Sequence, residues 1–365
     1  MSGHDPRPRF RGPRSGGGGV ATALAWLIAR LYLRRPELAE VIALRYRSLW
    51  ALLGGVANEV AYRRGRLRAP SLLSLNLELT NRCNLRCRMC PTGNGRMRRP
   101  RGDMDPRLFR RVLQRSRPLE FLLLFQWGEP LLHPRLPLLL REARRSGART
   151  LLTTNGTLLD DRRIGTVLDA KVDRVTVSID GDGATHARMR GIPLEETEAG
   201  LRRLVEARDA RRSRTAVDVS MVVGPDTEEA AASFAVRYRG WADRVQRIPL
   251  LTQGRRRTRC REPWRGGLVV LQDGRVSACC VDHDGELVVG DAREEDPRTI
   301  WNGPRMRALR RAHVEGDLPA LCARCTEYPS DAAAPRFSSR AEASTVVPEA
   351  PHAAPPRRGA VAGWV

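Results

Sequence analysis

Short apolar segments alternate with amphipathic segments from about residue 72 to residue 250, and this alternation limits the fold more than any other feature. The segments between the apolar runs, such as 106–115 and 136–146, have the apolar spacing of helices. Repeated strand–helix units of this kind form parallel sheets or barrels, and the spacing does not choose between the two. The expected strands are Ser74–Leu79, Phe121–Phe125, Thr150–Thr154, Arg174–Ile179, Val217–Val223 and Arg247–Leu250.

Three cysteines, Cys83, Cys87 and Cys90, lie within eight residues directly after the first expected strand. Three thiolates can hold three irons of a four-iron cluster and leave the fourth iron open, whereas a structural zinc or cluster site normally has four protein ligands. An iron without a protein ligand indicates a site where a substrate or cofactor binds and reacts. Because no export signal is evident, the clustered cysteines indicate metal ligands rather than disulfides, and a reducing cytoplasm as the compartment.

Polar motifs follow the next strands in order: Trp127–Pro130, Thr153–Gly156 and Ser178–Gly181. Together with the Cys-x-x-x-Cys-x-x-Cys spacing, these motifs resemble those of the radical S-adenosylmethionine (SAM) enzymes. Trp127 stands where that family usually has glycine, and Met89 stands where it usually has an aromatic residue.

The resemblance implies that Cys83, Cys87 and Cys90 bind a 4Fe–4S cluster whose open iron takes the methionine end of SAM. An electron from an external donor such as flavodoxin or ferredoxin would then cleave SAM to a 5′-deoxyadenosyl radical, which abstracts hydrogen from a substrate carbon. The core, residues 71–250, would be an α/β domain of the partial TIM-type (β/α)6 barrel class. The residues implied to bind SAM are Gly128, Glu129, Asn155, Ser178, Asp180 and Met89.

A second cysteine group lies in residues 251–330, where short β-like runs (268–271 and 287–290) and an expected helix (304–314) suggest a small α+β domain. This region resembles the SPASM and Twitch extensions of radical SAM enzymes. The resemblance implies one auxiliary 4Fe–4S cluster, because no cysteine follows Cys325. The implied ligands are Cys260, Cys279, Cys322 and Cys325. Cys280 in place of Cys279, and a zinc ion in place of the cluster, are the alternatives.

The segments outside these regions are expected to be disordered or helical. Residues 1–19 are rich in Gly, Pro and Arg, and residues 331–365 in Ala, Pro and Ser, so both are expected to be disordered. Residues 20–70 are expected to form a helical extension packed on the core. Peripheral membrane contact through residues 20–63 is the alternative, because the apolar stretch there is too short to span a bilayer.

The net charge of +23 is typical of a nucleic-acid-binding protein, but its source argues against that interpretation. Lys171 is the only lysine among 64 basic residues, and the arginines are scattered along the chain rather than gathered in one block. This one-sided choice favours codon bias in a GC-rich genome over selection for a phosphate-binding face.

Three functions compete. The leading hypothesis is a radical SAM enzyme that oxidises or rearranges a small hydroxylated metabolite, with the auxiliary cluster as electron acceptor. The second is a peptide-maturing radical enzyme, which many relatives combine with a winged-helix leader-recognition domain that residues 20–63 do not resemble. The third is an iron–sulfur or zinc protein that binds RNA. His133, Arg188 and Arg190 lie near strand ends or in loops and are expected to be solvated rather than catalytic.

Overall fold

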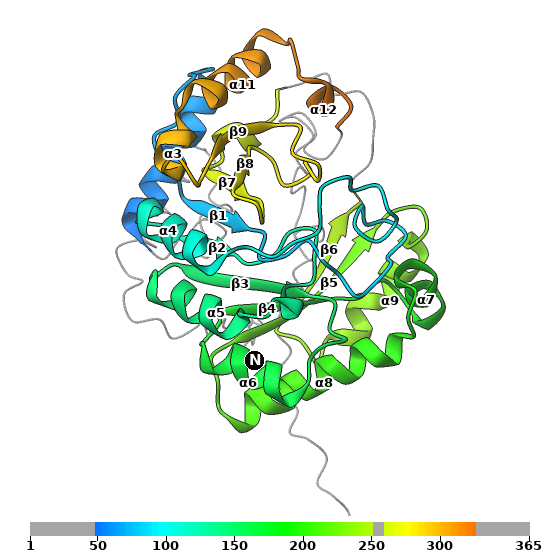
Figure 1. The fold of residues 1–365 in the computed structure, drawn as a ribbon. Helices are drawn as coiled ribbons and strands as arrows, with labels where there is room; N and C mark the ends of the chain where they lie inside the picture. The colour runs from blue at the N-terminus through cyan, green and yellow to red at the C-terminus, as the bar shows by residue number, and fades with distance from the viewer. Residues whose placement is uncertain (1–47, 251–258, 326–365) are drawn as a thin grey trace, which may run out of the picture.

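The computed structural model describes residues 48–250 and 259–325 (Figure 1). The predicted disordered segments 1–19 and 331–365, and residues 20–47 of the predicted helical extension, lie outside these ranges. The described part of that extension is helix α3, Leu49–Arg63. Within the described ranges, no helix has both the length and the apolar content that crossing a bilayer requires.

One sheet of nine strands runs through the molecule, in the order β6-β5-β4-β3-β2-β1-β7-β8-β9. All pairings from β6 to β7 along this order are parallel, whereas β7 pairs with β8, and β8 with β9, in antiparallel fashion. The strands are β1 Ser74–Leu77, β2 Phe121–Leu123, β3 Arg149–Thr154, β4 Arg174–Ser178, β5 Ala216–Val223, β6 Arg244–Pro249, β7 Gly267–Val270, β8 Arg275–Ser277 and β9 Val288–Asp291.

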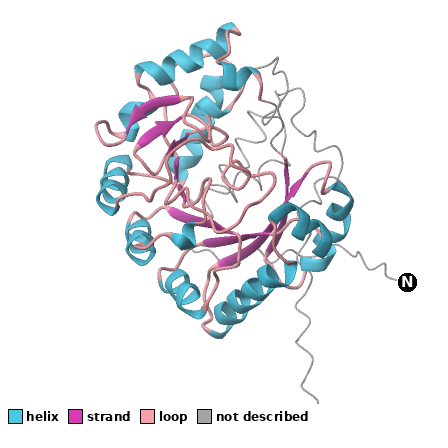
Figure 2. Ribbon diagram, turned by 45° about the vertical axis from the view of Figure 1, so that its right-hand side comes forward, coloured by secondary structure: helices cyan, strands magenta, loops and turns pink. Residues whose placement is uncertain are grey.

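The α/β class is confirmed, with two refinements. The sheet is curved but open, so the six predicted core strands do not close into a barrel (Figure 2). The described strands of the C-terminal region also belong to the core sheet, because β7 pairs in parallel with β1 and so extends the sheet at that edge.

Helices cover the outer side of the curved sheet, while loops gather on its inner side (Figure 2). Helix α4 illustrates why they form where they do: Asp105 Oδ1 accepts hydrogen bonds from the backbone N–H groups of Arg107 and Leu108, and Pro106 occupies the first turn. The remaining helices are α5 Leu136–Arg145, α6 Asp161–Asp169, α7 Gly183–Arg190, α8 Leu194–Ala210, α9 Glu228–Tyr238, α10 Pro297–Trp301, α11 Pro304–Glu315 and α12 Ala320–Ala323, with 3₁₀ turns at Pro130–Leu132 and Glu262–Trp264.

Alternate strand residues have opposite roles, as the two-residue period of a strand requires. Leu75 and Leu77 of β1 are fully buried in the core shared with the helices, and Leu152 and Val175 are their counterparts in β3 and β4. The residues between them point to the inner face and are more polar. The inner face and the carboxyl ends of the parallel strands therefore form the place where a site can be built.

Candidate functional site

The three thiols of the first cysteine group lie together in the loop after β1, each half-buried and within electrostatic range of the other two. Cys83 Sγ accepts hydrogen bonds from Leu85 N at 3.4 Å and Asn155 Nδ2 at 3.9 Å. Burial raises the pKa of the Cys83 thiol, and it raises the pKa of the Cys87 thiol to about 11. Binding of iron therefore has to displace the protons of both thiols. Cys90 N donates to Cys87 O at 3.2 Å, which turns the loop back on itself.

This arrangement fits an iron–sulfur cluster better than a single metal ion. Within residues 48–250 and 259–325, no three His, Cys, Asp or Glu side chains are grouped tightly enough to hold one ion. A cluster makes a different demand, because each thiolate binds a separate iron. Half-buried thiols with N–H groups directed at a sulfur meet that demand, since such hydrogen bonds stabilise cluster thiolates.

Two glycines permit close backbone packing around the cysteine loop. A Cβ on Gly128 would lie 2.2 Å from Thr80 O, and a Cβ on Gly93 would lie 2.4 Å from Cys87 N. Neither obstacle is a flexible side chain. Because glycine has no Cβ, Gly128 lets its backbone approach the backbone of the segment that follows β1, and the predicted binding of SAM by Gly128 stays a prediction.

Glu129 ties the end of β2 to the end of β3. Its side chain is buried, Oε1 accepts from Leu131 N at 3.0 Å and Thr154 Oγ1 at 2.9 Å, and Oε2 accepts from Asn155 N at 2.7 Å. Burial raises the pKa of Glu129 to about 7, against the opposing effect of these donors. Both oxygens are therefore engaged within the protein, and the binding of SAM by Glu129 stays a prediction.

Asp180 is fully buried behind the cysteine loop. Its Oδ2 accepts from Arg190 Nε at 2.7 Å, and its Oδ1 accepts from Val222 N at 2.9 Å. Its backbone N–H donates to His186 Nδ1 at 3.2 Å, and burial lowers the pKa of this histidine to about 4, which keeps it neutral. Asp180 thus holds Arg190 in place.

Arg190 belongs to the site, and the prediction that it is solvated is wrong. Its side chain is 9% exposed, and its charge lowers the pKa of Cys87 and of Glu129 against the larger effect of burial. The preceding residue, Met189, accepts a hydrogen bond from Arg88 N at 2.8 Å, which docks the cysteine loop on α7. The sequence carried no clear signal for this role, because Arg190 is one of 64 basic residues and only its buried pairing with Asp180 distinguishes it.

His133 and Arg188 form their hydrogen bonds with residues outside the two cysteine groups. His133 is buried rather than solvated as predicted: Nε2 bonds to Met104 O at 3.0 Å and Nδ1 accepts from Arg135 N at 3.1 Å. Arg188 is exposed, as predicted, and donates to Asp226 O at 2.9 Å. The contacts of His133 give it a structural role.

Ser178 and Met89, two predicted SAM-binding residues, are both half-buried. Ser178 ends β4 beside Ser220 of β5, and Met89 precedes Cys90 in the cysteine loop. These positions leave the predicted roles of both residues as predictions.

The second cysteine group is built around the loop between β8 and β9. Cys279, Cys280 and Cys260 interact, and a thiol–thiol hydrogen bond with Cys280 together with burial raises the pKa of Cys279. Asp282 orders this loop by accepting from Ser277 Oγ at 2.7 Å and from two backbone N–H groups.

Helix α12, which precedes Cys325 and contains Cys322, lies beside the same loop (Figure 1). Arg324 forms an ion pair with Glu286 at 2.9 Å. This ion pair holds the end of α12 against the loop that contains Cys279 and Cys280. The four-cysteine ligand set stays a prediction, with Cys279 as the expected ligand and Cys280 as the alternative.

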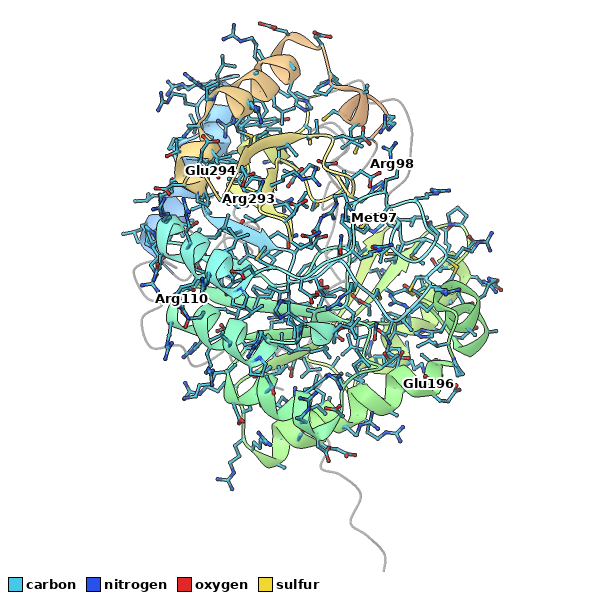
Figure 3. The ribbon with its side chains drawn as sticks, viewed as in Figure 1. Met97, Arg98, Arg110, Glu196, Arg293 and Glu294 are labelled. Atoms are coloured by element: carbon cyan, nitrogen blue, oxygen red, sulfur yellow. The ribbon has the colours of Figure 1, made fainter. Side chains whose placement is uncertain are left out.

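Contacts between the two cysteine regions were missed from the sequence. Gln126 Nε2 donates to Cys280 O at 2.6 Å, and the Trp127 ring packs edge-on against His283 at 5.9 Å. Arg98, labelled in Figure 3, pairs with Asp284 at 3.0 Å. The loop between β8 and β9, residues 278–287, is the auxiliary loop. These contacts pack it directly on the end of β2 and on the segment after the first cysteines.

Two family models match this chain. Residues 77–235 match the radical SAM superfamily, and residues 260–326 match the iron–sulfur cluster-binding SPASM domain. Residues 77–235 therefore form a radical SAM superfamily domain, and residues 260–326 form an iron–sulfur cluster-binding SPASM domain.

Curated relatives act on different substrates. The S-adenosyl-L-methionine-dependent 2-deoxy-scyllo-inosamine dehydrogenase of Niallia circulans is 23% identical over 69% of this chain and 91% of that protein. PqqA peptide cyclase of Streptomyces rochei is 31% identical over 48% of this chain and 52% of its own. The Pyrococcus furiosus protein that modifies the cofactor of tungsten-containing aldehyde ferredoxin oxidoreductase is 38% identical, and the chain spans only 30% of its length.

Solved structures share the fold. BtrN in complex with AdoMet and 2-DOIA has a TM-score of 0.50 at 20% identity, covering 69% of this chain and 92% of that one. SuiB of Streptococcus suis bound to its precursor peptide SuiA has a TM-score of 0.52 at 12% identity, covering 70% of each chain.

Proposed function

We propose that this enzyme oxidises or rearranges a small hydroxylated molecule by radical hydrogen abstraction. When bound, the cluster and SAM would supply a 5′-deoxyadenosyl radical as the acceptor of a hydrogen atom from a carbon bearing OH, and the auxiliary cluster would supply an acceptor for the second electron of an oxidation to the carbonyl, with the hydroxyl proton lost to a base. An external donor such as flavodoxin or ferredoxin supplies the first electron. The reducing cytoplasm expected from the clustered thiols suits this chemistry.

The contact between the two cysteine regions carries the proposal. Gln126, at the end of β2, reaches the carbonyl oxygen of Cys280 at 2.6 Å, so the second cysteine group packs against the carboxyl end of the core strands. A nearby electron acceptor suits a net two-electron oxidation. The likeness to a dehydrogenase of a small aminocyclitol, over 91% of that relative, supports the same substrate class.

The residues of this chain have separate roles in that scheme. Cys83, Cys87 and Cys90 hold the cluster, while Arg190 places a positive charge beside Cys87 and partly offsets the cost of a buried thiolate. Glu129 fixes the strand ends that frame the SAM site through its three hydrogen bonds.

Peptide maturation is the second candidate, supported by the likeness to PqqA peptide cyclase at 31% identity. An auxiliary cluster that accepts an electron suits peptide cross-linking as well. The two candidates differ in what should stimulate SAM cleavage.

The test uses anaerobically reconstituted protein with dithionite and SAM. We expect about eight irons per chain, and we expect hydroxylated cyclitols or sugars to raise 5′-deoxyadenosine release together with an equal amount of carbonyl product. Cys279→Ala should reduce the carbonyl product, with Cys280→Ala as the matched control. Stimulation by peptides alone would contradict the small-molecule proposal, and about four irons with one zinc would contradict the auxiliary cluster.

A further inference from the structure

A chain of amide side chains links the inner face of β1 to the auxiliary loop. Gln126 Nε2 donates to Cys280 O, and Gln126 Oε1 accepts from Asn76 Nδ2, each at 2.6 Å. A backbone carbonyl can only accept, so Cys280 fixes which end of the Gln126 amide faces it. Gln126 Oε1 therefore faces Asn76, and Asn76 donates to it through Nδ2.

This polarity leaves Asn76 Oδ1 without a hydrogen-bond donor among the described residues, although the Asn76 side chain is buried and the residue only 8% exposed. A buried acceptor left unpaired is destabilising, because it has lost its hydrogen bonds to water without gaining a donor from the protein. A second such atom lies on the residue after Gln126: Trp127 Nε1 is buried and has no acceptor in the described structure. One acceptor, Asn76 Oδ1, and one donor, Trp127 Nε1, therefore lack hydrogen-bond partners among the described residues next to the Gln126 amide.

The unsatisfied atoms lie between the two cysteine regions. Asn76 points to the inner face, because its neighbours Leu75 and Leu77 are buried on the helix side. The Trp127 ring contacts His283 of the auxiliary loop. Cys83 is hydrogen-bonded to Asn155 after β3, so the first cysteine group reaches toward β3, two strands from β1 on the side away from β7.

We propose that Asn76 Oδ1 and Trp127 Nε1 bind the substrate, an inference that rests on the proposed function and names the substrate class more closely. The ligand carries neighbouring hydroxyl or amino groups, one of which donates to Asn76 while an oxygen accepts from Trp127. Cyclitols and amino sugars have this pattern, because each hydroxyl both donates and accepts. Binding there also joins the substrate, through Gln126, to the loop that carries Cys280.

The test measures equilibrium binding to the reconstituted, full-length enzyme saturated with SAM. The probes are cyclitols with hydroxyl and amino groups, beginning with 2-deoxy-scyllo-inosamine. Asn76→Ala should weaken probe binding about tenfold or more, as expected for a lost hydrogen bond that leaves a polar group unpaired. Asn76→Asp keeps an acceptor and should restore most of the affinity for amine-bearing probes. Trp127→Phe keeps the ring, loses the N–H group and should weaken binding about fivefold or more.

The control is Asn58→Ala, which removes a buried asparagine whose amide is already paired with Ser71 at 2.7 and 2.9 Å. It should lower the stability of the protein and leave probe affinity unchanged. Three results would overturn the inference: the wild type binds no probe, Asn76→Ala and Trp127→Phe both bind the probes as tightly as the wild type does, or Asn76→Ala lowers the affinity for SAM by the same factor as the affinity for the probes. Absence of SAM cleavage by the wild type would instead overturn the proposed function.

Discussion

Replacing Arg99 with methionine should expose how strongly one buried ion pair holds the site together. Arg99 binds Glu78 through two parallel hydrogen bonds of 2.7 and 2.8 Å, and the two side chains are 3% and 0% exposed. Glu78 also accepts from Gln272 N at 3.0 Å, and Arg99 Nε donates to His283 O at 2.5 Å. The pair therefore connects β1, the segment after the first cysteines and the auxiliary loop.

The magnitude follows from what each substitution leaves behind. Arg99→Met leaves the buried Glu78 carboxylate with one backbone donor, and breaking a buried pair from one side costs about 3–5 kcal/mol. Replacing both partners, in Glu78→Leu/Arg99→Met, removes the uncompensated charge. The double variant should be more stable than Arg99→Met, although it leaves the Gln272 N–H group unpaired at a cost of about 1–3 kcal/mol. Both variants also lose the hydrogen bond from Arg99 Nε to His283 O.

The assay is urea unfolding of the anaerobically purified protein, followed by tryptophan fluorescence. Arg115→Met is the matched control, because Arg115 pairs with Asp296 at the surface, where the side chains are 48% and 42% exposed. Its free energy of unfolding should change by less than about 1 kcal/mol. The reasoning is refuted if Arg99→Met lowers the free energy of unfolding by no more than Arg115→Met does, or if the double variant is less stable than Arg99→Met.

Three further predictions concern other parts of the site. Because burial lowers the pKa of His186 from 6.5 to about 4, the unfolded state takes up its proton first as the pH falls. The contribution of His186 to the free energy of unfolding should be complete above pH 6.5 and fall by about 3 kcal/mol toward pH 4. The free energy of unfolding of His186→Gln should lack this fall, and identical pH curves for the variant and the wild type would contradict the assignment. Arg190→Met leaves a buried carboxylate unpaired and removes a charge beside the cluster ligands, so 5′-deoxyadenosine release should drop about tenfold or more; wild-type rates would count against its role. Gly128→Ala should reduce iron incorporation, because its Cβ would lie 2.2 Å from a backbone oxygen, whereas Gly240→Ala meets nothing within 4 Å and should load normally; equal iron content in both would show that the backbone can move aside.

The six core strands could be predicted because apolar periodicity is a local signal. Each expected strand overlaps an observed one, and the predicted helices at 106–115 and 136–146 correspond to α4 and α5. Strand β8, Arg275–Ser277, was missed because three residues with little apolar character give no pattern. Its structure depends on pairing with β7 and β9, and no local signal shows that β7 extends the core sheet beside β1.

The cysteine loop and the strand-end motifs were likewise available from spacing alone. Gln126 was not, because its importance comes from a contact with a residue 154 positions away. Arg190 was overlooked because one arginine in a chain with 64 basic residues carries little information, and only its buried pairing with Asp180 distinguishes it. His133 was assigned to solvent because burial cannot be read from a polar residue in a turn.

SAM cleavage by the reconstituted enzyme tests the central claim most directly. With dithionite and SAM, the wild-type protein should release 5′-deoxyadenosine, and Cys87→Ala should release none. Cys280→Ala removes a cysteine that is not expected to bind iron, so this variant should retain the activity. A wild-type protein that releases no 5′-deoxyadenosine, or a Cys87→Ala variant that releases as much as the wild type, would contradict the account.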